Sequence, residues 1–351
     1  MRETKAVRPG EEIDTERLGP FMTSKMSPTG GEIIVEQFPA GSSNLTYLVR
    51  FGDAEYVLRR PPYGNTVKSA HDMRREFDVL SKLSVVYSPA PKPRLFCDDH
   101  TIIGSEFYLM ERRKGVILRG RAPEELEKSP SSQRKLCESF VKNLAVLHSL
   151  DIRKAGLATL GKPENYCRRQ VEGWSKRYFA AKTGDVRDLE KVIAWLNENI
   201  PGESGASIVH NDYKFDNVML DPGDLTRITA VLDWEMVTVG DPLMDLGTTL
   251  GYWMSEDAGE ELLSMPFNPR VLMENISRAE LVEMYENSLG RAVRDMLFYY
   301  VFGTFKIAVI AQQIYARYVN GFTMDARFAT FDKFVAALGR IASGAVQRQS
   351  I

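Results

Sequence analysis

One polar loop constrains this chain more than any other feature. Residues 210–217 read His-Asn-Asp-Tyr-Lys-Phe-Asp-Asn, and Asp233 follows sixteen residues after the last of them in a Leu-Asp-Trp-Glu segment. Between them lie two apolar runs, residues 218–220 and 228–232, joined by an Asp-Pro-Gly-Asp turn. This pattern predicts a loop followed by a β-hairpin. Because the hairpin returns antiparallel, we expect Asn217 at its start and Asp233 at its far end to share one metal ion.

The residue types in these segments suit the transfer of a phosphoryl group, which needs a carboxylate to orient a hydroxyl and oxygen ligands for Mg²⁺. We interpret Asp212 as the catalytic base and Lys214 as a point charge on the transferring phosphate. Asn217 and Asp233 would bind the metal. Glu235, two residues further along an extended segment, would point the same way and bind the metal or its water. A solvated side chain is the alternative for both Lys214 and Glu235.

Three further residues near the loop read as structural. We expect the His210 ring to anchor the loop backbone by hydrogen bonds, because no second histidine lies nearby to complete a metal site. Asp241 precedes Pro242, which is typical of an N-cap followed by proline at the first helical position, and Asp245 lies one turn on. We expect both aspartates to cap the helix and brace the loop.

The composition is that of an ordinary globular chain. Its 351 residues suffice for a large core and two lobes, and the net charge of −2 gives no reason to expect nucleic acid or a membrane as a partner. Cys97, Cys137 and Cys167 are widely spaced and odd in number, and the N-terminus lacks an apolar signal-peptide core, so we expect a cytoplasmic protein. The apolar stretch 296–315 contains Lys306, which favours a buried helix over a membrane span.

Strand patterns come first along the chain and helical patterns follow. Strands are expected at residues 33–38, 45–50, 56–59 and 106–110, with a short helix after Asp14 and another from about Ser69. Later helices are expected at residues 136–149, 170–181 and 189–199, and after a capping box from Ser277 to Glu280. We place a boundary after Arg113. The prediction is an α+β, bilobal, kinase-like plan with a sheet lobe of residues 1–113 and a mostly helical lobe of residues 114–351.

The sheet lobe supplies candidates for contacts with the nucleotide phosphates. Arg59 ends the third strand and Glu76 lies on the next helix, so an ion pair between them would orient a cation toward the phosphates. Kinases usually carry lysine here, and arginine is bulkier and bidentate. The turn that contains Ser42, Ser43 and Asn44 would bring backbone N–H groups and hydroxyls over the phosphates.

The adenine site is expected where the fourth strand meets the lobe boundary. Backbone groups near Glu111 and Arg113 would bind the base, and Met110 would line its pocket. An ordinary turn between a strand and a helix is the alternative. Neither a glycine fingerprint after the first strand nor a G-x-x-x-x-G-K-[ST] loop occurs, which argues against the other common nucleotide-binding architectures.

The combination H-N-D-x-K-x-x-N, L-D-W-E and G-D-P-L-x-D-L-G resembles the aminoglycoside phosphotransferase and choline kinase group of the protein-kinase-like fold. Residues 57–62, 70–77 and 305–318 are most similar to the kinase-like domain that animals carry fused to an acyl-CoA dehydrogenase. The resemblance implies ATP or GTP as donor, Mg²⁺, Asp212 as base, Asn217 and Asp233 as metal ligands, and Arg59 in place of the usual lysine.

The acceptor stays open between two chemistries. The branch resemblance implies a hydroxyacyl-CoA-like alcohol, for which a basic patch near residues 112–121 would hold the phosphates. Acidic residues in 251–290 would instead favour a cationic alcohol of the aminoglycoside or choline type. A catalytically silent nucleotide-binding pseudokinase is the alternative class, because of Arg59. A protein kinase is disfavoured, since helix resumes at Pro242, too soon after Asp233 for a long activation loop. Monomer and homodimer both remain open.

Overall fold

The fold has the α+β class expected from the sequence, with a five-stranded antiparallel sheet early in the chain and mostly helices after it. The computed structural model describes residues 3–26, 32–39, 44–62, 72–254, 258–263 and 267–351. Two units divide the chain. The first comprises Met1–Lys114 with Ala230–Glu235, and the second comprises Gly115–Thr229 with Met236–Ile351.

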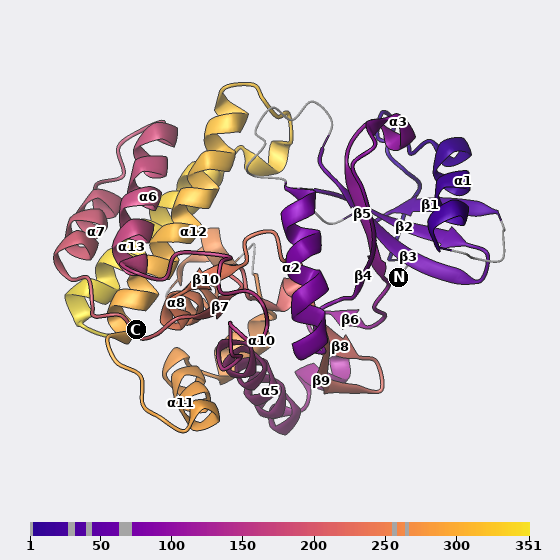
Figure 1. Ribbon diagram of the computed structural model, residues 1–351. Helices are drawn as coiled ribbons and strands as arrows, with labels where there is room; N and C mark the ends of the chain where they lie inside the picture. Colours follow the sequence, from indigo (N-terminus) through magenta and orange to yellow (C-terminus); the bar gives the residue numbers. More distant parts are fainter. Residues whose placement is uncertain (1–2, 27–31, 40–43, 63–71, 255–257, 264–266) are drawn as a thin grey trace. The chain divides into compact units, whose positions relative to one another are not determined.

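The sheet of the first unit has the strand order β1-β2-β3-β5-β4 (Figure 1). Its strands are β1 (Ile33–Gln37), β2 (Leu45–Phe51), β3 (Ala54–Arg60), β4 (Pro93–Cys97) and β5 (Phe107–Glu111). Four of them were predicted, and β4 was not, because a run of prolines leads into it. As an edge strand, β4 tolerates a proline that a central strand would not. The register pairs Arg59 with Thr46 on one side and Tyr108 on the other, which places Arg59 centrally in the sheet.

The described residues of the first unit also form the helices α1 (Thr15–Met26), α2 (Met73–Val86) and α3 (His100–Ile103). Leu18 and Met22 of α1 join Tyr47, Val49 and Leu58 of the strands in one apolar core. The expected start of α2 near Ser69 lies outside the described residues, and the described helix begins at Met73. The Asp72 side chain accepts a hydrogen bond from the Arg75 N–H and so caps the helix there.

The second unit is helical apart from short strands (Figure 1). Its helices are α4 (Glu124–Glu127), α5 (Pro130–His148), α6 (Tyr166–Ala181), α7 (Arg187–Glu198), α8 (Pro242–Gly251), α9 (Glu260–Leu263), α10 (Arg270–Asn275), α11 (Arg278–Leu289), α12 (Met296–Val319) and α13 (Phe331–Arg348). Its strands are β6 (Val116–Ile117), β7 (Ser207–Val209), β8 (Val218–Asp221), β9 (Asp224–Val231) and β10 (Thr238–Gly240). The β8–β9 hairpin and the α11 capping box were both predicted.

Helices α8 and α12 approach each other closely through a pair of glycines. A Cβ atom at Gly303 would collide with the backbone of Gly247, and one at Gly247 would collide with the backbone of Tyr299. No other residue fits such a contact. The crossing matters for function because Asp245 of α8 and Lys306 of α12, each within one turn of a glycine, both reach the 210–217 loop.

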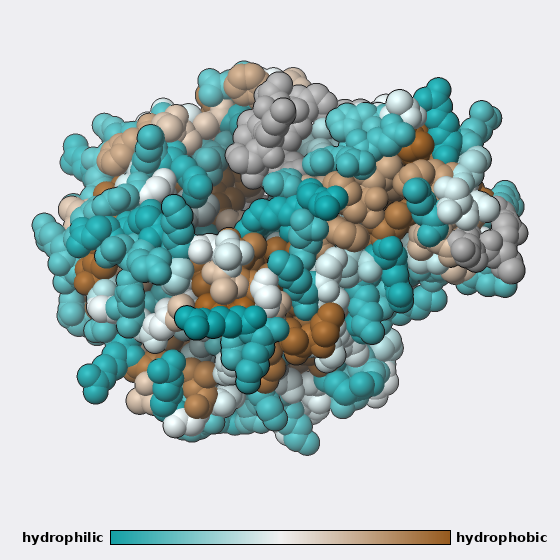
Figure 2. Space-filling view, viewed as in Figure 1, coloured by the Kyte–Doolittle hydropathy of each residue, from teal (hydrophilic) through white to brown (hydrophobic). Residues whose placement is uncertain are grey.

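The α12 helix is long and apolar enough to cross a membrane by length and composition alone, but 78% of its most apolar stretch is buried. It packs against α6, α7, α8 and α13. The visible surface over α6 and α7 is mostly hydrophilic (Figure 2). The expectation of a buried core helix is therefore confirmed.

Candidate active site

The 210–217 loop of the second unit places a carboxylate among several hydrogen-bond donors. Lys214 Nζ lies 2.9 Å from Asp212 Oδ2 and 3.1 Å from Oδ1. The Tyr252 hydroxyl donates to Oδ1 at 2.6 Å, and Asn217 Nδ2 donates to Oδ2 at 2.9 Å. A carboxylate accepts about four hydrogen bonds, so these contacts use its full capacity. Lys214 and Asn217 thus both contact Asp212, whereas the sequence pointed to contacts with a phosphate and a metal ion.

Electrostatics keep this carboxylate ionised. Burial opposes its charge, but Lys214 and the hydrogen bond from Tyr252 outweigh that effect and lower the pKa of Asp212. The pKa of Lys214 is raised, because the charge of Asp212 outweighs the burial of the ammonium. An ionised Asp212 can orient a substrate hydroxyl and take its proton late in the transfer, which is the function expected of it.

Tyr252 is a site residue that the sequence analysis missed. It follows the last turn of α8, forty residues after Asp212. The Lys214 ammonium also lies 4.7 Å from the centroid of the Tyr252 ring and 5.9 Å from the centroid of the Phe267 ring. The side chain therefore holds both members of the Asp212–Lys214 pair. No local sequence pattern marks this role, because it arises only when α8 packs behind the loop.

The loop backbone is held by a buried carboxylate. Asp245 accepts hydrogen bonds from the N–H groups of His210, at 2.6 Å, and Asn211, at 2.7 Å. His148 Nε2 lies 3.1 Å from the same carboxylate. The His210 ring accepts a hydrogen bond from the Asp212 N–H at 3.2 Å. The geometry agrees with the bracing roles expected for His210 and Asp245.

A buried lysine completes the support of the loop. Lys306 of α12 donates to the backbone oxygen of Asn211 at 2.6 Å, and its side chain is only 1% exposed. Asn211 has a φ of 68°, a left-handed conformation that asparagine tolerates. Lys306 was expected to be buried, but its contact with the loop was not anticipated.

Asp241 acts as the N-cap of α8. Its carboxylate accepts from the Leu243 N–H at 2.9 Å and from the Ser204 N–H at 2.9 Å, and the Ser204 hydroxyl and Tyr299 hydroxyl also contact it. All of these groups are uncharged donors that belong to the helix or its surroundings. The expected capping role agrees with this geometry.

Three acids of the first unit contact Arg59. Arg59, 8% exposed, places Nε 3.4 Å from Glu76 Oε2, and its Nη2 lies 3.1 Å from Asp233 Oδ1 and 3.5 Å from Glu235 Oε2. The Asn44 amide donates to Glu235 at 2.8 Å. The expected pair of Arg59 with Glu76 is present. The contacts with Asp233 and Glu235 were not foreseen.

The two acids reach Arg59 by a different backbone from the one expected. Asp233 and Glu235 were assigned to an extended segment, but β9 ends at Val231 and Asp233 has a left-handed φ of 64°. Trp234, 1% exposed, anchors the turn by donating from its indole to the Val231 carbonyl. Strand alternation is therefore the wrong explanation for the shared direction of the two carboxylates, which follows from the turn.

The charges in this cluster shift the pKa values of both Arg59 and Glu76. Burial alone would lower the pKa of Arg59, but Glu76, Tyr108 and the two acids beyond them raise it well above the usual value. Burial raises the pKa of Glu76, with a smaller contribution from Asp233, although Arg59 opposes the rise. One guanidinium therefore contacts three carboxylates.

Other residues predicted to bind the nucleotide lie in the same unit. Met110 and Glu111 end β5, with Met110 buried. The Arg113 guanidinium contacts the Glu111 carboxylate at 2.7 Å and the Ser88 carbonyl at 3.0 Å. Ser42 and Ser43 lie outside the described residues.

The proposed metal ligands are oxygen donors of the kind that Mg²⁺ prefers. The amide nitrogen of Asn217 donates to the backbone and side chain of Asp212, which leaves the amide oxygen as the available ligand atom. In the first unit, Asp233 and Glu235 offer carboxylates that share one guanidinium. Within the described part of the chain, no group of three His, Cys, Asp or Glu side chains forms a metal site by itself. The donor chemistry fits Mg²⁺ that is also held by nucleotide phosphates.

Comparison with known proteins defines the family. The profile of the phosphotransferase enzyme family matches residues 34–267. The chain therefore belongs to this family, and its fold is kinase-like. A putative aminoglycoside phosphotransferase from Ralstonia eutropha is 31% identical, with a TM-score of 0.79 over 95% of this chain and 99% of that one. Choline kinase from Cryptosporidium parvum shares the fold, with a TM-score of 0.66 at 13% identity over 96% of this chain and 97% of that one.

Curated relatives are longer than this chain. Acyl-CoA dehydrogenase family member 11 of Gallus gallus is 34% identical over 88% of this chain and 40% of its own length. The probable acyl-CoA dehydrogenase IBR3 of Arabidopsis thaliana is 31% identical over 90% of this chain and 40% of its own length. The chain thus spans about two fifths of the relatives that it matches.

Proposed function

We propose that this chain transfers the γ-phosphate of ATP or GTP, bound with Mg²⁺, to a hydroxyl group of a small molecule. The observation that carries the proposal is the environment of Asp212. A half-buried, ionised carboxylate beside a lysine ammonium is suited to orient an alcohol next to a phosphate. Structural groups alone would not need both charges in a loop that is braced from two helices.

Each residue of the loop has a distinct role in this reaction. Asp212 accepts a hydrogen bond from the acceptor hydroxyl and takes its proton. Because three side chains already make four contacts with the carboxylate, the hydroxyl must replace one of them. Lys214 is the donor best suited to leave, since its ammonium can turn to the transferring phosphate and free a position on either oxygen. Tyr252 and Asn217 then keep the carboxylate in place.

The nucleotide side of the proposal involves the first unit. Arg59 would meet the α and β phosphates, and Asn217, Asp233 and Glu235 would supply metal ligands. The Mg²⁺ ion would neutralise charge on the phosphates. A thermostable mutant of an aminoglycoside phosphotransferase, which shares this fold at 14% identity and a TM-score of 0.60, was solved in a ternary complex with ADP and hygromycin B. That structure supports nucleotide use by the fold, while the roles of these particular residues are our proposal.

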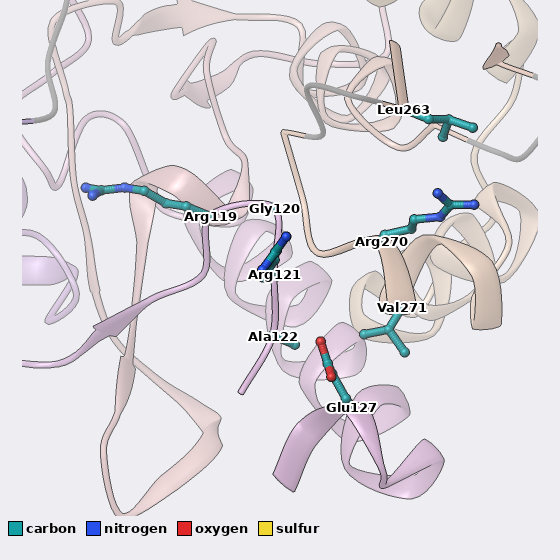
Figure 3. Close-up of a pocket in the computed structure, with 8 residues that line it drawn as sticks. All are labelled: Arg119, Gly120, Arg121, Ala122, Glu127, Leu263, Arg270 and Val271. Atoms are coloured by element: carbon teal, nitrogen blue, oxygen red, sulfur yellow. The ribbon is translucent and has the colours of Figure 1, made fainter. Parts of the chain in front are cut away.

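The acceptor is proposed from a cavity of about 570 Å³ in the second unit. Its lining combines three arginines with small and apolar residues and one acid: Arg119, Gly120, Arg121, Ala122, Glu127, Leu263, Arg270 and Val271. In Figure 3, Arg121 stands across from the helix that carries Arg270, while Arg119 extends away from that helix. The charge of Arg119 opposes the burial that raises the pKa of Asp216, so this arginine lies near the catalytic loop.

This lining favours an acceptor with a phosphate-bearing tail over a cationic alcohol. Arg119 and Arg121 form no ion pair with a described residue, whereas Arg112, Arg113 and Lys114 are paired with Glu3, Glu55 or Glu111. Free guanidinium groups bind phosphate in a bidentate manner. The similarity to acyl-CoA dehydrogenase family members points the same way, and we propose a hydroxyacyl-CoA-like acceptor.

The proposal is tested by incubating the protein with labelled Mg-ATP and a small-molecule extract, then identifying each labelled species by mass spectrometry. We expect an alcohol that already carries phosphate. Arg121→Glu should raise its KM at least tenfold, while Arg294→Glu, an exposed arginine outside the cavity lining, should not. Labelling of cationic alcohols alone would contradict the proposed acceptor. No labelled product under any condition would contradict the transfer itself.

A nucleotide-binding pseudokinase is the second candidate, and one observation favours it. Arg59 already pairs with Asp233 and Glu235, the carboxylates that would bind the metal. If that pairing persists when nucleotide binds, the chain would hold a nucleotide without Mg²⁺ and without turnover. Nucleotide titrations with and without Mg²⁺ separate the two functions. Affinity that depends on Mg²⁺ supports the enzyme, and equal affinity in EDTA supports the pseudokinase.

A further inference from the structure

Lys306 is an unexpected residue in the middle of α12. It is 1% exposed and lies between buried apolar residues, including Phe305 and Ile307. Burying an ammonium group is unfavourable unless its partners compensate for the lost water. An uncharged side chain of the same length, such as methionine, would fill this space without that cost. The packing of α12 therefore gives no reason for a lysine here.

The contacts of the ammonium point to the catalytic loop. Lys306 Nζ lies 2.6 Å from the backbone oxygen of Asn211 and 3.3 Å from its side-chain oxygen. The Trp174 ring centroid lies 5.6 Å away. On the other side of the same residue, the Asn211 N–H donates to Asp245. Opposite charges from α12 and α8 thus hold the two ends of one residue, which immediately precedes Asp212.

Neutralising Asp245 does not account for this geometry. The Asp245 carboxylate accepts from the backbone of His210 and Asn211 and contacts His148, and no hydrogen bond from Lys306 to it is present. The ammonium is directed at the Asn211 carbonyl, which is the peptide group that joins Asn211 to Asp212. Fixing that peptide fixes the direction in which the Asp212 side chain leaves the loop.

We propose that Lys306 is a positioning residue for phosphoryl transfer, which holds the Asn211–Asp212 peptide so that the Asp212 carboxylate faces the acceptor hydroxyl. The inference depends on the proposed function for its kinetic consequences. It adds a residue from the distant α12 helix, 94 positions after Asp212 in the chain, to the machinery of the loop.

The charge of this lysine titrates in an accessible range. Burial lowers the pKa of Lys306 to about 8, although Asp245 of α8 and Asp212 of the loop favour the charged form. Arg177 of α6 and Lys214 of the loop act in the same direction as burial. As the pH rises through 8, Lys306 loses its charge, and its hydrogen bond to the Asn211 carbonyl weakens. Turnover should therefore fall above this pH.

The kinetic test compares Lys306→Met with Lys306→Arg and with a matched control, Gln312→Met. Gln312 is also a buried polar residue of α12, but it donates to Ala181 and Thr183, away from the loop. Lys306→Met should lower kcat at least tenfold, leave the KM for nucleotide within about twofold, and remove the decline above pH 8. Lys306→Arg should retain more activity and lose the decline near pH 8. Gln312→Met should behave like the wild type.

Hydrogen exchange provides a second measurement that does not need turnover. Peptides that cover residues 207–217 should exchange faster in Lys306→Met than in the wild type or Gln312→Met, while peptides from the first unit stay unchanged. Unchanged exchange in this segment, or a Lys306→Met enzyme with wild-type kcat and pH profile, would overturn the positioning role. A wild-type protein that transfers no phosphate would refute the proposed function instead, and the exchange result would still decide whether Lys306 holds the loop.

Discussion

The two units hold their charged groups in opposite ways. In the second unit, one carboxylate, Asp212, receives hydrogen bonds from three side chains. In the first unit, one cation, Arg59, is shared by three carboxylates. The Asp212 carboxylate is thus oriented before any ligand binds, whereas Arg59 is surrounded by carboxylates. We infer that the second unit is ready for chemistry and that Mg²⁺ with its nucleotide completes the first.

Among the variants that test this contrast, the largest expected effect is on turnover when Lys214, a donor to Asp212, loses its charge. Lys214→Met removes a cation from both Asp212 and the transferring phosphate. We expect kcat to fall by about 10²–10³, equivalent to roughly 3–4 kcal/mol, because charge stabilisation in a buried site is strong. Steady-state kinetics measure this. A kcat within a factor of about three of the wild type would show that the Lys214 charge beside Asp212 does not contribute to catalysis.

Removing the shared cation of the first unit should mainly affect stability. Arg59→Met leaves Glu76, which is 2% exposed, without its partner, and we expect a loss of about 3 kcal/mol in the free energy of unfolding. Urea titration measures it. The double variant Arg59→Met/Glu76→Leu should recover most of the loss, because the uncompensated buried charge is gone. If the double variant is as unstable as the single one, Glu76 is not the acid that depends on Arg59.

Tyr252→Phe tests one donor of the second unit with a minimal change. The variant loses a 2.6 Å hydrogen bond and keeps the ring beneath Lys214. We expect kcat to fall about tenfold, or roughly 1.4 kcal/mol, with little change in melting temperature. The pKa of Asp212 should rise in the variant, so the acid side of the pH–rate profile should move to higher pH. An unshifted profile would contradict the role of Tyr252.

The smallest expected effect is on the pH dependence of stability, and its sign should differ between the units. The pKa of Asp245 is lowered, mainly because hydrogen bonding and charge from His148 outweigh burial. Its stabilisation is therefore complete above the unfolded value near 3.8 and is lost below it. Burial raises the pKa of Glu76, so its ionisation costs stability as the pH rises above 4.5.

Urea unfolding between pH 3 and pH 6 separates the two cases. Asp245→Asn should weaken the increase in stability in the acidic part of that range, and Glu76→Gln should steepen the increase above pH 4.5. If both variants change the slope of stability against pH in the same direction, the proposed contrast between the two units is wrong. That contrast is between a carboxylate held in its ionised form and a carboxylate whose ionisation costs stability.

The sequence predicted the parts of this molecule that are encoded locally. The α8 cap at Asp241, the capping box at Ser277 and the β8–β9 hairpin all follow from short patterns whose physics is local. Asp212, Lys214 and Asn217 were singled out because these residues share one loop, but their contacts with one another were not predicted. The pairing of Arg59 with Glu76 was inferred from the order of the elements.

Contacts made across the fold could not be predicted in this way. Tyr252 and Lys306 reach the loop only because α8 and α12 cross at Gly247 and Gly303. The left-handed turn at Asp233 likewise depends on the buried Trp234 beyond it, and alternating strand geometry gave the wrong backbone there. Long-range packing therefore determines how the loop is supported, whereas the residue types that suggest its chemistry can be read from the loop sequence.

The most direct test of the central claim separates binding from turnover in Asp212→Asn. Calorimetry with Mg-ADP measures nucleotide affinity, and transfer of labelled phosphate to small molecules measures turnover. The proposed role predicts affinity within about twofold of the wild type and a loss of turnover of at least about a thousandfold, within the range of a lost general base together with its charge. Turnover equal to that of the wild type at full nucleotide occupancy would contradict Asp212 as the base.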